Sequence, residues 1–413
     1  MTVDDEDTVL KNGAISIEGN KIRAVGKNEE VVGKYSEENV IDGSGMVAMP
    51  GLVKTHTHTP MTLLRGYADD LPLMRWLKEK IWPMEAKLKP SDVYYGSLLA
   101  CLELTSFGVT TFSDMYMHPD QILRAVKKSG LRAVISPAIF DVMEGNSLKD
   151  AKKFFKIGSP ERVEFGLGPH SPYACSRECL EEVRDMAIEK NMMVHIHASE
   201  TREEMSQMKK KYGMTSIEFL DSIGLLNEKT PLAHTVWASD EEIKIIRKRK
   251  AKVVHCPISN MKLASGVAPI DKMTGINVSL GSDGPSSNNN LDMFEEMKLA
   301  SLVHKLNRLD PTLITARQSL RMGTINGART LGLNDTGTLE VGKKADLILL
   351  DFRKPHLTPV YNPISHLVYS CNGGDVDTTI CDGKVLMRNR KLNLDSREIM
   401  KKVNEIKKEL LER

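Results

Sequence analysis

The sequence lacks the features of a membrane or secreted protein. No apolar run approaches the roughly 20 residues that a membrane-spanning helix needs, and the acidic start, Met1–Asp7, has no apolar segment of the kind found in secretory signals. Aromatic residues are only 5% of the 413 and the formal net charge is +2, which indicates neither a base-stacking nor a strongly basic surface. We therefore expect a cytoplasmic protein with no nucleic-acid partner and no membrane partner.

Cysteine is also scarce, with 6 residues that form no CxxC pair. Without a dense framework of cysteines, a chain of this length is expected to keep its thiols reduced. Cys175 and Cys179 are close in sequence, but no second pair accompanies them, so we do not expect a metal site there.

The sequence pattern in the middle of the chain is typical of repeated strand–helix units. Short apolar runs alternate with longer helical patterns, such as the helix predicted over 91–106. Eight such units predict a parallel sheet closed into a (β/α)8 barrel over residues 49–337, so the fold class is α/β. The predicted strands are the one before His56 and those at 108–114, 131–136, 163–168, 193–197, 232–234, 252–255 and 278–281.

The two ends of the chain share a strand-and-turn character that the middle lacks. Gly19-Asn20 and Asp382-Gly383 are two-residue hairpin signals flanked by apolar residues. We predict a small β-sandwich domain formed by both termini, residues 1–48 plus 338–395, followed by a charged surface helix over 396–413. The predicted strands lie at 14–18, 21–25, 41–49, 345–351 and on both sides of Asp382-Gly383.

A His-Thr-His motif, His56-Thr57-His58, ends the first barrel strand. Residues i and i+2 of a strand project to the same face, so both imidazoles would point into the barrel at its C-terminal mouth. Two histidines placed in this way suit a divalent metal.

Other strand ends carry residues of the same chemistry. Because the C-terminal strand ends of a barrel meet at one mouth, these side chains are expected to converge with the first motif. They are His195 and His197 on a middle strand, His234 and His255 on the two strands that follow, and Asp283 after the last strand.

These motifs resemble those of a known family over nearly the whole chain. The stretch 49–58 is similar to the first-strand metal motif of the amidohydrolase superfamily, and 280–284 is similar to its last-strand aspartate. Several longer stretches resemble the branch of deaminases that act on 5'-methylthioadenosine, S-adenosylhomocysteine and 5'-deoxyadenosine. They are 64–73, 81–85, 197–201, 255–260 and 282–289.

The resemblance implies one divalent metal, zinc or alternatively iron, held by His56, His58, His197 and Asp283. Three imidazoles and a carboxylate leave a position for water, and the metal would make hydroxide available near neutral pH. A second metal would normally need a carboxylated lysine on a middle strand as a bridging ligand. The predicted strand at 163–170 contains no lysine, so a mononuclear site is favoured. His195 shares a face with His197 and is a rival ligand.

The resemblance also assigns the catalytic roles. Glu200 would bind the adenine and deliver a proton to ring N1 while hydroxide attacks C6, and then help ammonia to leave. His234 would orient the water. Asp283 would act as a ligand, accept the proton of the water and contact the substrate.

Two further residues would bind the nucleoside by the same resemblance. The two oxygens of the Glu85 carboxylate suit the 2' and 3' hydroxyls of a ribose. His170 would contact the nucleoside. Trp76 and Trp82 are candidates for the pocket wall, although packing within a helix accounts for at least one of them.

The expected reaction is hydrolytic deamination of 5'-modified adenosines to the inosine analogue and ammonia. The candidate substrates are 5'-deoxyadenosine, 5'-methylthioadenosine, S-adenosylhomocysteine and adenosine. No arginine lies between Arg132 and Arg162, where similar enzymes bind the carboxylate of the homocysteine group, and a lysine such as Lys149 lacks the bidentate fork. We therefore expect small or apolar 5' groups to be used at least as well as homocysteine.

Two alternatives stay open at this point. One is another amidohydrolase, a deaminase or chlorohydrolase of the guanine or triazine type, and the other is a catalytically silent barrel that acts as a binding protein. Zinc deaminases of the His/Cys/Cys type are excluded, because their HxE and PCxxC motifs are missing. A homo-oligomer is expected, and Met1 begins late relative to similar chains, which predicts either a missing edge strand or an upstream start.

Overall fold

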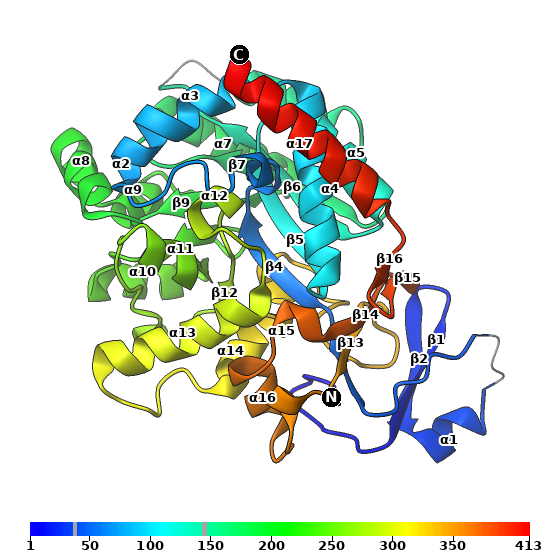
Figure 1. The fold of residues 1–413 in the computed structure, drawn as a ribbon. Coiled ribbons are helices and arrows are strands. Elements are labelled where there is room, and N and C mark those ends of the chain that lie inside the picture. Colours follow the sequence, from blue (N-terminus) through cyan, green and yellow to red (C-terminus); the bar gives the residue numbers. More distant parts are fainter. Residues whose placement is uncertain (36–38, 143–146) are drawn as a thin grey trace.

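The computed structural model describes residues 1–35, 39–142 and 147–413. Its parallel strands confirm the predicted (β/α)8 barrel (Figure 1). One run pairs in the order β4-β5-β6-β7-β8 and the other in the order β9-β10-β11-β12. The circle closes where Thr57 bridges Asp283, and β8 and β9 are two parts of one strand interrupted at His195. The barrel strands are β4 (Leu52–Thr57), β5 (Val109–Tyr116), β6 (Arg132–Ile139), β7 (Val163–Pro169), β8 (Met193–Val194), β9 (Ile196–Ala198), β10 (Pro231–His234), β11 (Lys252–His255) and β12 (Val278–Leu280).

Two barrel strands run more than one residue further than their sequence predicts. β5 continues to Tyr116 and β6 to Ile139, and every residue of both is buried. The predicted strand ends at Ser136, just before Pro137, a residue that offers no N–H to a sheet. Pairing with the neighbouring strand carries β6 past that proline, since Tyr116 lies opposite Pro137. The extension matters because it places Tyr116 at the mouth of the barrel.

Helices cover the outside of the barrel (Figure 1). The helix predicted over 91–106 is α4 (Pro90–Ser106), and the side chain of Asp92 accepts the Lys89 N–H at its start. A hydroxyl accepts a backbone N–H at the start of several others, for example Thr201 at the N-terminus of α8. The remaining barrel helices are α5 (Pro119–Ser129), α6 (Leu148–Phe155), α7 (Arg177–Lys190), α8 (Arg202–Tyr212), α9 (Ser216–Ser222), α10 (Asp240–Arg249), α11 (Pro257–Lys262), α12 (Pro285–Asn288), α13 (Met293–Arg308), α14 (Ala316–Met322) and α15 (Ile325–Thr330).

The segment between β4 and α4 is helical and carries Glu85 at its end. It consists of α2 (Leu73–Trp76), one π-helical turn at Leu77–Ile81 and α3 (Trp82–Glu85). Trp76 is buried and donates its indole N–H to Ala68 O at 2.9 Å, so it packs within this segment. Single π-helical turns are frequent at functional sites.

Both termini contribute to an antiparallel β region beside the barrel. β1 (Gly13–Glu18) and β2 (Lys21–Lys27) form the predicted hairpin, and a five-stranded sheet pairs in the order β16-β15-β14-β13-β3. Apolar side chains from both sheets, including Ile22, Leu347 and Ile380, make a separate small core. The other elements here are β3 (Met46–Pro50), β13 (Leu347–Asp351), β14 (Val376–Cys381), β15 (Lys384–Arg388), β16 (Lys391–Leu392), α1 (Asn28–Val32) and α16 (Pro363–Tyr369).

Two strands of this region are shorter than predicted, and the one expected at 345–351 begins at Leu347. The strand expected at 41–49 begins only at Met46, because the carboxylate of Asp42 accepts the N–H of Ser44 at 2.9 Å and closes a turn. A buried guanidinium then links the β region to the barrel. Arg132 on β6 donates to Asp346 at 2.9 Å and to Asp382 at 3.2 Å.

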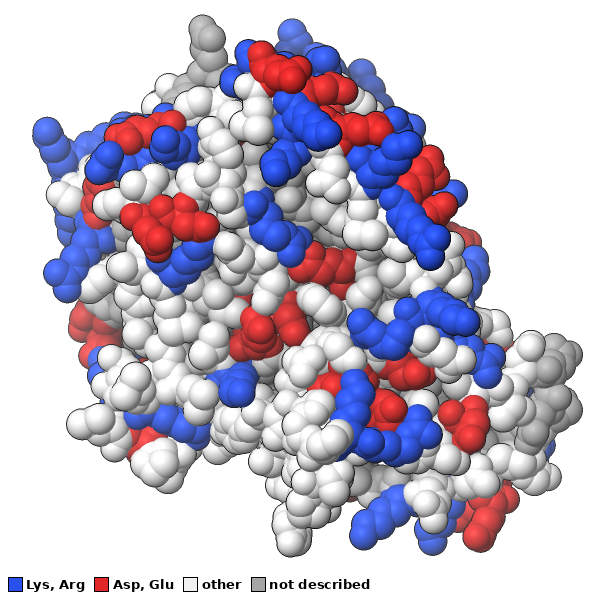
Figure 2. All heavy atoms as spheres, viewed as in Figure 1, with Lys and Arg blue, Asp and Glu red and all other residues white. Residues whose placement is uncertain are grey.

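The C-terminal helix α17 (Ser396–Glu412) lies along α4 (Figure 1). Ile399 packs with Leu98 and Leu102 of α4, while basic and acidic side chains alternate on the opposite face (Figure 2). This matches the predicted charged surface helix over 396–413. Among the described residues, no helix combines the length and the apolar character that crossing a membrane requires.

Candidate active site

Histidines and an aspartate from four barrel strands converge at the C-terminal mouth. Ligand atoms of His56 on β4, His197 on β9, His234 at the end of β10 and Asp283 after β12 all lie within 4.8 Å of one another. His58 joins them, with Nε2 3.2 Å from Asp283 Oδ1. The group therefore contains all four predicted metal ligands together with His234.

Each histidine is held through Nδ1, which turns Nε2 towards the centre of the group. His58 Nδ1 lies 2.5 Å from Met115 O, and His197 Nδ1 lies 2.6 Å from His170 O. Such contacts fix the ring orientation and the tautomer of a metal-binding histidine.

His195 lies behind the group. Its Nε2 is 3.0 Å from Nδ1 of His56, and its Nδ1 is 3.3 Å from the hydroxyl of Ser113. In this position it supports His56 from the side opposite the centre. His255 is also apart from the group, with its ring packed against His304.

The donor set fits a divalent metal. His56 Nε2 is fully buried and has no hydrogen-bond partner in the described structure, yet it lies 3.5 Å from Asp283 Oδ1. An orphaned buried nitrogen is costly, and a cation between it and the carboxylate would satisfy both groups. Imidazole nitrogens with one carboxylate oxygen form the ligand type that zinc uses in catalytic sites.

The Asp283 carboxylate favours positive charge on its neighbour His58, whereas burial lowers the pKa of His56 to about 3 and that of His197 well below its usual value. Burial opposes a charged imidazole at His58, but the hydrogen bond and the negative charge of Asp283 outweigh it and raise the pKa of His58 to about 9. Burial would raise the pKa of Asp283, yet the adjacent imidazoles of His56 and His58 hold it well below its usual value.

Two serines that the sequence analysis did not single out hold the other oxygen of Asp283. The hydroxyls of Ser259 on α11 and Ser287 on α12 both donate to Oδ2 at 2.7 Å. Both lie in stretches that carried the family resemblance, but nothing in their spacing indicates a shared partner. With Oδ2 held in this way, Oδ1 faces the histidines.

Glu200 is buried beside the group at the start of α8. Its carboxylate lies 3.9 Å from His234 Nε2, and burial raises its pKa to about 7. The backbone here is held by the buried side chain of Glu204, which accepts the N–H groups of Ser199 and Glu200 at 2.7 and 2.8 Å. A carboxyl group with a pKa near neutrality can both donate and accept a proton.

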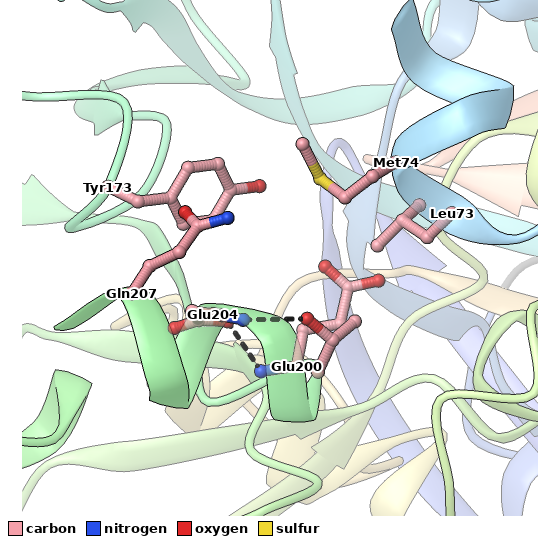
Figure 3. A pocket seen from close by; sticks show the side chains of 7 residues that line it. Leu73, Met74, Tyr173, Glu200, Glu204 and Gln207 are labelled. Atoms are coloured by element: carbon pink, nitrogen blue, oxygen red, sulfur yellow. Dashed lines mark hydrogen bonds between the residues drawn. The ribbon is translucent and has the colours of Figure 1, made fainter. Parts of the chain in front are cut away.

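A small pocket opens next to Glu200 (Figure 3). In this view its carboxylate points towards Leu73 and Met74 of α2, and Tyr173 lies across the pocket from them. The walls near Glu200 are thus largely apolar.

The two predicted nucleoside-binding residues lie near the same mouth. His170 follows β7, and its ring centroid is 4.7 Å from that of His197; burial lowers its pKa to about 4. Glu85 accepts the hydroxyl of Tyr116 at 2.6 Å, and burial raises the pKa of Glu85 to about 7. Tyr116 was also absent from the sequence prediction.

Cys175 and Cys179 lie close to an acidic residue that is distant from them in the sequence. Asp141, on the loop after β6, lies with Cys175 and Cys179 inside 4.8 Å. Its carboxylate accepts the backbone N–H and the hydroxyl of Ser176, and Cys175 donates to Ile139 O. The contacts of Asp141 with Ser176 stabilise the N-terminus of α7. All six cysteines are buried and free.

Comparison with known proteins gives consistent matches. Residues 47–386 match a family model described as the amidohydrolase family. The chain is 48% identical to a 5'-deoxyadenosine deaminase of Methanosarcina acetivorans, covering 100% of this chain and 97% of that protein. It is 46% identical to a 5-methylthioadenosine/S-adenosylhomocysteine deaminase of Pelotomaculum thermopropionicum, covering 97% of this chain and 94% of that protein.

Solved structures show the same architecture. A zinc-bound adenosine deaminase from Xanthomonas campestris superimposes with a TM-score of 0.96 at 32% identity, covering 100% of this chain and 97% of that one. A zinc complex of atrazine chlorohydrolase from Arthrobacter aurescens superimposes with a TM-score of 0.89 at 26% identity, covering 98% of this chain and 97% of that one.

Proposed function

The chain belongs to the amidohydrolase family, and on that premise we propose that it hydrolyses 5'-modified adenosines to the corresponding inosine analogue and ammonia. The observation that carries this proposal is Glu200, a buried carboxyl group with a pKa of about 7 at the edge of a histidine–aspartate donor group. Full-length relatives at 46–48% identity are named as deaminases of such nucleosides.

A divalent metal is the cofactor of this family, and we propose zinc, with iron as the alternative. His56, His58, His197 and Asp283 would hold it, and it would lower the pKa of water so that hydroxide is available near neutral pH. The zinc-bound adenosine deaminase with the same fold supports zinc.

The chain's own residues would supply the proton transfers. Glu200 would protonate adenine N1 and then the departing ammonia. His234, 3.9 Å from Glu200 and within the donor group, would orient the attacking water. Asp283 would take the proton of that water through Oδ1, which accepts the N–H of Gly284 and lies on the side of the histidines, since Oδ2 already accepts two hydroxyls.

Glu85 and His170 would bind the nucleoside. The Glu85 carboxylate would accept hydrogen bonds from the 2' and 3' hydroxyls of the ribose, and His170, beside His197, would contact the purine nucleoside. Asp283 and Glu200 complete the contacts to the reacting ring.

For the 5' substituent, we propose that small or apolar groups are used at least as well as homocysteine. No arginine occurs between Arg132 and Arg162 to bind an amino-acid carboxylate, and Lys149 is exposed on α6. Leu73, Met74 and Tyr173 give the pocket beside Glu200 an apolar wall. A large preference for S-adenosylhomocysteine in steady-state kinetics would reject this proposal.

We also propose that the enzyme is a homo-oligomer and that it resides in the cytoplasm; its buried free cysteines support the second of these proposals only. The functional test is an ammonia-release screen over 5'-deoxyadenosine, 5'-methylthioadenosine, S-adenosylhomocysteine and adenosine, with the metal measured on the same sample. Guanine and a chlorotriazine serve as controls for the alternative amidohydrolase activities. Protein without metal and without ammonia release from any adenosine would favour a silent barrel.

A further inference from the structure

Two consecutive residues at the end of β5 hold two different parts of the site. Met115 O lies 2.5 Å from Nδ1 of His58, a proposed metal ligand. The hydroxyl of Tyr116 lies 2.6 Å from Oε1 of Glu85, the proposed ribose acceptor. A site built on a strand is placed more precisely than one built on a loop, so a side chain fixed to β5 has a defined position.

The proton of this pair belongs to the tyrosine. Burial and the adjacent Glu85 carboxylate raise the pKa of Tyr116 well above 10. Burial raises the pKa of Glu85 to about 7, and the hydrogen bond from Tyr116 acts in the opposite direction. The tyrosine therefore donates, and the bond favours the ionised carboxylate, which is the form that accepts hydrogen bonds.

The pair leaves one carboxylate oxygen for a ligand. Tyr116 is the one hydrogen-bond partner that the described residues offer to the Glu85 carboxylate, and it binds Oε1. Glu85 is itself only partly buried and ends a short helix, so its side chain would otherwise sample several rotamers. With Oε1 fixed, Oε2 has a restricted set of positions.

We infer that Tyr116 is a positioning residue that holds Glu85 for the ribose hydroxyls and so makes the enzyme select ribosides over 2'-deoxyribosides. This inference rests on the proposed function, in which Glu85 accepts those hydroxyls. Among the described residues the Tyr116 hydroxyl bonds Glu85, whereas its ring lies 6.2 Å from that of His58. Removing the hydroxyl alone should therefore weaken recognition of the sugar and leave proton transfer at the purine intact.

The test compares Tyr116→Phe, Glu85→Gln and the double variant with 5'-deoxyadenosine and 2',5'-dideoxyadenosine as substrates. Tyr116→Phe keeps the ring and removes only the hydroxyl. It should raise KM for 5'-deoxyadenosine about tenfold, the usual effect of losing one hydrogen bond to a charged group, and leave kcat nearly unchanged. KM for the dideoxy substrate should rise much less, so the preference for the riboside falls.

Tyr369→Phe is a matched control. Its hydroxyl lies 2.9 Å from the hydroxyl of Ser301, away from the mouth on α16, so the same chemical change there should leave both KM values as in the unmodified enzyme. In the Glu85→Gln background, Tyr116→Phe should add little, because both changes remove one coupled interaction.

The outcomes separate the inference from the function it rests on. If Glu85→Gln leaves the preference for the riboside unchanged, the proposed ribose contact is wrong. If Glu85→Gln lowers that preference and Tyr116→Phe does not, the ribose contact holds and the role of Tyr116 is overturned. Equal loss of kcat on both substrates in Tyr116→Phe would also overturn it, because that pattern indicates a general structural role.

Discussion

Oδ1 of Asp283 lies 3.2 Å from Nε2 of His58, and the opposite carboxylate oxygen faces away from the histidines. That second oxygen is not free to turn inward, because the hydroxyls of Ser259 and Ser287 both donate to it at 2.7 Å. Oδ1, which also accepts the N–H of Gly284 at 2.8 Å, is therefore the oxygen on the side of the histidines, while Oδ2 anchors the side chain to α11 and α12.

Removing this anchor should weaken the site. We expect the double variant Ser259→Ala, Ser287→Ala to lose about 10-fold or more in metal affinity or kcat, as is usual for groups that orient a metal ligand. Metal content after dialysis and kcat measure the effect. Ser286→Ala is the control, since its hydroxyl contacts Met61 and not Asp283; an equal loss in that variant would contradict the account.

Metal removal should abolish activity and lower stability together. A chelator that strips the protein should eliminate ammonia release, and adding zinc back should restore it. Because a ligand that binds only the folded state stabilises it, the metal-free protein should also unfold at a lower temperature. Full activity in a sample shown to contain no metal would contradict the proposed mechanism.

The substitution Glu200→Gln should lower kcat strongly. Amide replacement keeps the shape of the side chain but cannot donate and accept the proton in turn, so we expect a drop of about 100-fold or more. The exposed neighbour Glu203 is the control, because Glu203→Gln makes the same chemical change outside the pocket. Comparable kcat values for the two variants would remove Glu200 from the mechanism.

The link between the barrel and the β region can be tested through stability alone. Arg132→Met removes the guanidinium that pairs with buried Asp346 and Asp382, and leaves Asp346 without its charged partner. Breaking a buried pair in this way should cost about 3 kcal/mol or more in the free energy of unfolding. Arg75→Met, which breaks an exposed pair with Glu79, should cost far less in the same denaturant titration, because solvent screens that pair.

The sequence predicts the barrel and the convergence of its histidines with Asp283 because both follow from local patterns, whereas the proposed roles of Glu200, Glu85 and His170 follow only from the family resemblance. His56-Thr57-His58 predicts convergence from strand alternation, and Asp283 follows an apolar run that reads as the last strand. No local sequence pattern marks the residues that hold the site residues in place, such as Tyr116. Tyr116 and Glu85 are separated by β5, α4 and a turn, so only the folded barrel brings the hydroxyl to the carboxylate.

The most direct measurement of the central claim is the product balance of the zinc-loaded protein with 5'-deoxyadenosine. The account predicts that one ammonia and one 5'-deoxyinosine form for each nucleoside consumed, and that Glu200→Gln suppresses both to the same degree. No ammonia from this or any other 5'-modified adenosine, with turnover of guanine or a chlorotriazine instead, would contradict it.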